Sequence, residues 1–189
     1  MGTFSVWHWA IVLLFIGVPV FFAVRSAAKP SRNPEALVGF GGWLMLLAIG
    51  QTLSPLRTLA DFANTADGYQ QLMTLTNGPL AVYGEVALNL AFLALQLVVL
   101  VSMLRRSHRF PQLFLLQWLA IPVVFVLDTI WVASVLGVPV SKVVAGDALV
   151  APIASFVGTG IWAAYVYKSV RVRNTFTRAN ASAQIASAS

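Results

Sequence analysis

The apolar run from Pro79 to Arg106 constrains this chain more than any other stretch. It is long enough to cross a bilayer, because a transmembrane helix needs about 20 mostly apolar residues. Glu85, Asn89 and Gln96 interrupt it. At about 100° per residue, Asn89 lies about 40° and Gln96 about 20° round the helix from Glu85, so all three share one stripe. Ionisable groups are costly inside a membrane, so we expect this stripe to face protein or water.

The composition agrees with a membrane protein. Of the 189 residues, 59% are hydrophobic and 10% are charged, whereas a soluble domain is about 45–50% apolar and about 25% charged. The formal charge of +6 does not indicate a nucleic-acid partner, because the basic residues lie in short clusters between apolar runs, without an aromatic recognition motif. The chain has no cysteine, which excludes disulfides, thiolate metal sites and cysteine nucleophiles.

Five apolar segments predict an all-α fold, a polytopic membrane bundle of five transmembrane helices. We expect an additional N-terminal transmembrane helix at 1–25, a four-helix membrane domain at 36–178 and a disordered tail at 179–189, whose apolar content is too low for folding. Inside the domain the expected spans are 36–53, 79–106, 114–136 and 148–167. Residues 56–77 predict either an amphipathic helix on the outer membrane surface or a loop packed on the bundle.

The first apolar segment has the charge pattern of an uncleaved span. A secretory signal carries positive charge before its apolar core, whereas here Arg25, Lys29 and Arg32 follow it. Cleavage near Ala27 or Ala28 is the alternative, because the run is short and small residues follow it.

The distribution of Lys and Arg predicts the orientation. Only Arg57 and Lys142 flank one side of the expected spans. The other ten of the 12 basic residues flank the opposite side: Arg25, Lys29, Arg32, Arg105, Arg106, Arg109, Lys168, Arg171, Arg173 and Arg178. Because cytoplasmic loops carry the excess of positive charge, we expect the N-terminus outside and the C-terminus in the cytoplasm.

Short motifs from Gly41 onward carry a family resemblance. They are Gly41-Gly42-Trp43-Leu44 opening a span, Ser54-Pro55-Leu56-Arg57 closing it, Glu85 with Asn89, Phe110-Pro111 after a basic cluster, and a terminal signature of Ile161, Trp162, Tyr165, Ser169, Arg171, Val172, Thr175 and Phe176. In these motifs the chain resembles a bacterial membrane-protein family catalogued as domain of unknown function 2569. The resemblance implies a four-helix core and a multi-pass protein of the bacterial plasma membrane, and it implies no particular reaction.

Four polar residues form a candidate intramembrane site: Arg57, Glu85, Asn89 and Asp128. They should lie at similar depths, and a buried carboxylate is expensive unless it is paired. One interpretation is a structural ion pair between Arg57 and a carboxylate, or a capped polar cluster, either of which would fix the helix register. A second is that the carboxylates extend to the outer surface. The third is an outward-facing substrate or proton site.

A second candidate surface follows the last span and comprises Ser169, Arg171, Arg173, Thr175 and Phe176. Its basic residues predict contact with anionic lipid headgroups. Ser, Thr and Phe are not needed for charge, which favours a cytoplasmic partner as the alternative.

Enzyme signatures are not apparent, so we expect no catalytic, cofactor-binding or metal site. His8 and His108 fall on opposite sides of the predicted membrane and cannot share a metal. The glycine-rich segment 39–42 opens a span and has neither a preceding strand nor a following lysine, unlike a phosphate-binding loop.

The function expected from these patterns is that of a non-enzymatic membrane component. Small residues at i, i+4 steps in the last span, Ala151, Ser155, Thr159 and Ala163, favour close helix contacts. Such contacts would join the chain to a second copy of itself or to another membrane protein within the lipid bilayer. The alternative is a small transporter or proton-coupled permease that uses the polar stripe, with a small-molecule substrate that the sequence does not identify.

Overall fold

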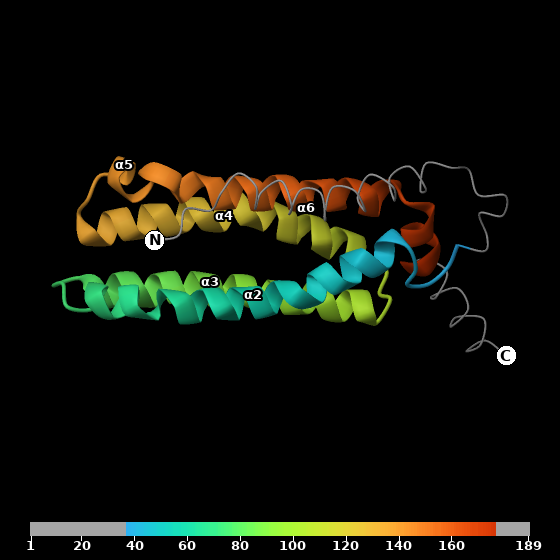
Figure 1. The fold of residues 1–189 in the computed structure, drawn as a ribbon, viewed down its shortest axis with the longest axis horizontal. Helices are drawn as coiled ribbons and strands as arrows, with labels where there is room; N and C mark the ends of the chain where they lie inside the picture. Colours follow the sequence, from blue (N-terminus) through green and yellow to red (C-terminus); the bar gives the residue numbers. More distant parts are fainter. Residues whose placement is uncertain (1–36, 177–189) are drawn as a thin grey trace, which may run out of the picture.

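The computed structural model describes residues 37–176, which form helices joined by short loops and contain no strand (Figure 1). The expected span at 1–25 and the expected tail at 179–189 lie outside the described residues. Residues 170–176 form a short terminal helix. The preceding elements are α2 (Trp43–Leu72), α3 (Gly78–Leu104), α4 (Phe110–Leu136), α5 (Val140–Val143), the 3-10 helix η2 (Gly146–Leu149) and α6 (Val150–Lys168).

Three of the described helices, α3, α4 and α6, are long and apolar enough to cross a membrane. They coincide with the spans expected at 79–106, 114–136 and 148–167, and they support a membrane location. Prolines help to set two of their starts, since Pro79 and Pro111 stand in the first turns of α3 and α4. In a first turn the missing N–H of proline would be unpaired in any case.

The helix break expected before Pro55 is wrong, because α2 runs through Pro55 and continues to Leu72. Proline removes one backbone hydrogen bond from a helix interior. Contacts with α3 hold the second half of α2 in place. Thr58 Oγ1 lies 3.2 Å from Gln96 Oε1, and the Tyr69 hydroxyl donates to Glu85 Oε1 at 2.9 Å. Residues 56–72 are therefore neither a separate surface helix nor a loop.

The long helices pack in the order α2, α3, α4 and α6, each against the next. Aromatic side chains make two of these contacts. Trp131 of α4 packs over Gly84 of α3, where a Cβ atom would overlap its ring, and its Nε1 donates to the carbonyl of Ala81 at 3.2 Å. Trp118 of α4 stacks on Phe156 of α6, with ring centroids 4.8 Å apart.

A cluster of buried apolar side chains lies at one end of the bundle, whereas Ala81 and Val82 of α3 and Ala133 of α4 are buried at the other. The members of the cluster come from every long helix and from the terminal helix: Leu44, Leu47, Val99, Met103, Phe110, Phe114, Ala163, Val166, Val172 and Phe176. The buried residues of α2 all lie between Trp43 and Pro55, and those of α6 are Ala163 and Val166. The start of α2 thus meets the end of α6 (Figure 1), whereas their other halves are not packed together.

Candidate functional site

A cavity of about 420 Å³ lies between α2, α3, α4 and α6, beyond the core. All four residues of the candidate intramembrane site line it. Arg57 comes from α2, Glu85 and Asn89 come from α3, and Asp128 comes from α4. α2 and α6, which meet only at the core end of the bundle, both contribute residues to the wall of the cavity. The structure thus brings together residues that lie up to 71 positions apart in the sequence.

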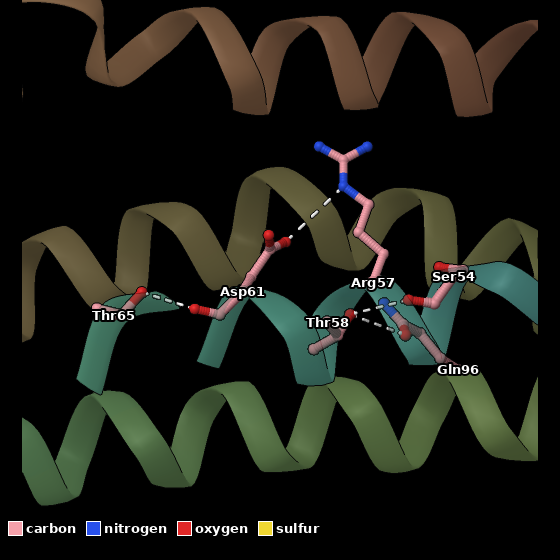
Figure 2. A network of polar contacts seen from close by, with 6 residues as sticks. All are labelled: Ser54, Arg57, Thr58, Asp61, Thr65 and Gln96. Atoms are coloured by element: carbon pink, nitrogen blue, oxygen red, sulfur yellow. Dashed lines mark hydrogen bonds and ion pairs between the residues drawn. The ribbon is translucent and has the colours of Figure 1, made fainter. Parts of the chain in front are cut away.

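Arg57 does not pair with the carboxylates expected for it. Its Nε lies 3.8 Å from Oδ2 of Asp61, one turn later on the same helix. The side chains of Arg57 and Asp61 are 80% and 66% exposed, respectively. Figure 2 shows the guanidinium extending away from α2, on the side that faces α6. The ion pair between Arg57 and a carboxylate of α3 or α4 is therefore a wrong prediction, because Asp61 lies closer along the same helix.

Glu85 and Asn89 are tied to their surroundings in different ways. The hydroxyl of Tyr69 donates to Oε1 of Glu85 at 2.9 Å, which joins α2 to α3 across the cavity wall. Asn89 Nδ2 donates to the backbone carbonyl of Glu85 at 3.0 Å. The amide of Asn89 thus serves its own helix, and the carboxylate of Glu85 accepts from a neighbouring one.

Asp128 is the least satisfied polar group of the site. Its Oδ1 atom is buried and accepts no hydrogen bond from the described part of the chain. A buried carboxylate oxygen in this state costs free energy unless a proton, a water molecule or a ligand meets it. The unpartnered oxygen of Asp128 therefore carries an energetic cost that the described chain does not offset.

Sequence reasoning missed a polar stripe on α2, because it placed the second half of that helix outside the bundle. The stripe lines the cavity and comprises Ser54, Thr58, Asp61, Thr65 and Tyr69. These positions follow one another at steps of three or four residues, which is the spacing of one helix face. The same period that revealed the α3 stripe would have found them, had α2 been continued past Pro55.

Hydrogen bonds between side chains close the cavity toward the core. Thr58 of α2 meets Gln96 of α3 (Figure 2). One and a half to two turns nearer the core, Gln51 Nε2 donates to Gln117 Oε1 of α4 at 2.6 Å. Gln51 and Gln117 are only 5% and 4% exposed. Beyond them lie the apolar side chains of Leu47 and Phe114. The amide pair does not line the cavity and lies between it and the core.

The second candidate surface divides into buried and exposed parts. The hydroxyl of Thr175 accepts from the backbone N–H of Gly39 at 2.9 Å, and Phe176 stacks on Phe110 with ring centroids 4.5 Å apart. Thr175 and Phe176 are each 1% exposed, which does not fit the expected contact with lipid or a partner. They attach the terminal helix to the start of the described chain. Arg173 remains exposed.

The other two residues of that surface are half-buried. Ser169 Oγ accepts from the backbone N–H of Val172 at 3.3 Å, which caps the terminal helix. The guanidinium of Arg171 packs against Gly41, where a Cβ atom would require it to move. Among residues 37–176, no group of three or more His, Cys, Asp or Glu side chains could hold a metal ion.

Comparison with known proteins gives one result. The family model described as protein of unknown function DUF2569 matches residues 37–177. Neither a curated protein nor a solved structure gives a significant match. The match covers the described helices and all residues of the cavity.

Proposed function

We propose that this chain, which belongs to the DUF2569 family, is a small transporter that binds a polar solute in the cavity between α2 and α6. The proposed role involves no catalysis. The observation that carries it is the cavity itself, in which polar side chains of α2, α3 and α4 meet inside an apolar bundle. Its volume of about 420 Å³ falls within the range of about 300–1,000 Å³ found for small-molecule sites.

The cost of the polar lining supports a role in binding. Ionisable groups within transmembrane helices are expensive, and they typically mark substrate or ion pathways. Glu85 and Asp128 lie in two of the three helices long and apolar enough to cross a membrane. Apolar side chains at these positions would pack the bundle more cheaply, so stability alone does not explain the carboxylates.

Association with another membrane protein receives less support from the geometry. The small-residue ridge of α6 was the surface expected for it. Ala163 is buried in the chain's own core, and Ala151 and Ser155 line the cavity. The ridge therefore serves the bundle itself at one end and the cavity at the other.

The proposal includes a topology of five spans in the bacterial plasma membrane, with residues 1–25 as the first span. Arg105 and Arg106 follow α3, and Lys168 ends α6, all at the core end of the bundle. The positive-inside rule supports a cytoplasmic position for this end. The core then closes the cytoplasmic side, and the cavity belongs to the outer half of the protein.

Cysteine accessibility tests the proposal, because the chain has no cysteine of its own. Ser155 lines the cavity, whereas Val157, two residues later on α6, is 55% exposed and does not. In membranes, Ser155→Cys should react with a charged methanethiosulfonate reagent at least about tenfold faster than Val157→Cys, since the thiolate forms in water and not in lipid. Equal and slow labelling of both variants would mean that the cavity is not water-filled, and would refute the proposal.

A further inference from the structure

We infer that the solute is a small organic cation, an amine or a quaternary ammonium group held between Glu85 and Asp128. This inference rests on the proposed function and narrows it to one class of ligand. It depends on the charge balance of the cavity, the unpartnered oxygen of Asp128 and the aromatic side chains of the walls.

The charge balance of the cavity is negative. The charged side chains lining it are one arginine and three carboxylates: Arg57, Asp61, Glu85 and Asp128. Arg57 and Asp61 pair with each other at the exposed side of α2. Glu85 receives a hydrogen bond from the neutral Tyr69, and no cation of the described chain pairs with either Glu85 or Asp128. A positive ligand would therefore offset a charge that the protein leaves uncompensated.

Asp128 is the second carboxylate of the cavity wall without a cationic partner, and its Oδ1 atom is closed off from solvent. It accepts no hydrogen bond within residues 37–176, although it belongs to a residue that lines the cavity. Hydrogen bonds to a charged group are stronger than those between neutral groups, and leaving the charged group unmet costs the most. An ammonium or quaternary ammonium group in the cavity, close to the carboxylate of Asp128, would offset this charge.

Aromatic side chains indicate that the cation is organic. Phe62 of α2, Phe92 of α3 and Phe125 of α4 line the same cavity as the carboxylates. Aromatic ring faces attract cations within about 6 Å, and they are widely used to recognise quaternary ammonium groups. The methyl or methylene groups of such a ligand would also fill a volume of about 420 Å³ that greatly exceeds one water molecule, whose share of liquid volume is about 30 Å³.

Choline and its uncharged isostere, 3,3-dimethylbutan-1-ol, test the inference because they share a shape and differ in charge. Binding to the purified full chain in nanodiscs is measured by isothermal titration calorimetry. We expect choline to bind at least about tenfold more tightly than the isostere, which is the effect of one interaction with a charged group. This comparison uses the unaltered protein and does not depend on whether a variant folds.

Three variants locate the interaction. Glu85→Gln and Asp128→Asn should each weaken choline binding by about tenfold or more, because each removes one carboxylate charge while the side-chain size is kept. Asp67→Asn removes an exposed carboxylate of α2 that does not line the cavity, and it should leave the affinity unchanged. Thermal unfolding of each variant checks that the fold is retained.

The outcomes separate this inference from the proposed function. If the isostere binds as tightly as choline, the solute-binding function stands and the cationic ligand is excluded. If neither compound binds, or if the Glu85 and Asp128 variants bind choline as well as the Asp67 variant does, the inference is also overturned. Failure of the Ser155 labelling experiment would overturn both.

Discussion

At the scale of single residues, two buried amides lie between the cavity and the apolar core. Gln51 and Gln117 are nearly inaccessible and satisfy each other at 2.6 Å. A buried polar group that loses its partner costs about 1–3 kcal/mol, whereas replacing both partners by apolar groups can be nearly neutral. Replacing one glutamine of the pair should therefore cost more stability than replacing both.

We predict that Gln51→Leu and Gln117→Leu will each lower the free energy of unfolding by about 1–3 kcal/mol, because each leaves a buried amide without its partner. The double substitution should cost less than the sum of the two. Reversible unfolding in mixed micelles measures all three variants. Additive losses would show that the two amides are not coupled.

A different result is expected for the Arg57 and Asp61 pair. Arg57→Gln should change the free energy of unfolding by no more than about 1 kcal/mol, because exposed ion pairs contribute little. The same unfolding assay measures it, with Asp61→Asn as the matched variant. A loss of several kcal/mol would indicate a buried partner for Arg57, as the sequence suggested.

The gathering of Glu85, Asn89 and Asp128 could be predicted, because the helix period and similar depth already place them together. The partner of Arg57 could not, since it depends on α2 continuing to Asp61 in helical register. The bond between Tyr69 and Glu85 has the same origin. Both of these errors thus trace to the misjudged end of α2.

At the scale of elements, that misjudgement has a physical cause. Proline and a change to polar composition after Leu53 indicate the end of a span, and both signals are local. The contacts that carry α2 past Pro55 come from α3, through Thr58 and Tyr69. Local patterns cannot reveal such tertiary support, whereas the long apolar runs of α3, α4 and α6 specify their helices without it.

The contact between α3 and α4 depends on a missing side chain, which gives a prediction for Gly84. We expect Gly84→Ala to destabilise the protein by about 1–3 kcal/mol, because the added methyl group would displace the Trp131 ring. Gly158→Ala is the control, since no atom outside its local backbone lies within 4 Å of the added Cβ. It should be neutral or stabilising by up to about 1 kcal/mol. Thermal unfolding of the two variants measures the difference. Equal effects would contradict the close contact between Gly84 and Trp131.

At the scale of the whole molecule, the predicted orientation can be tested independently of the cavity. Ser141→Cys lies between α4 and α6, and Ser107→Cys lies between α3 and α4. In intact cells, a membrane-impermeant maleimide should label Ser141→Cys and reach Ser107→Cys only after permeabilisation, because the proposed orientation puts the basic loop in the cytoplasm. The reverse labelling pattern would show that the orientation in the membrane is opposite to the proposed one.

The distribution of the core was beyond sequence reasoning, because α3, α4 and α6 are apolar along most of their length. Only the structure shows that α2 is buried in its first half and α6 in its second. The location of the cavity follows from this distribution, because α2 and α6 are joined by the apolar cluster at one end and line the cavity beyond it.

The apolar cluster at one end also means that α2 and α6 are packed more tightly there than at the other end. Side chains such as Phe110, Phe114 and Phe176 pack the helices together at one end. At the other end, α2 packs on α3 and α6 packs on α4, and no comparable apolar cluster of the described residues joins α2 to α6. Backbone amide exchange should therefore be slowest near this apolar cluster and faster toward the opposite ends of α2 and α6. The polar residues of the cavity lie in these less tightly packed halves, so we expect the width of the cavity to vary more than the packing of the apolar cluster.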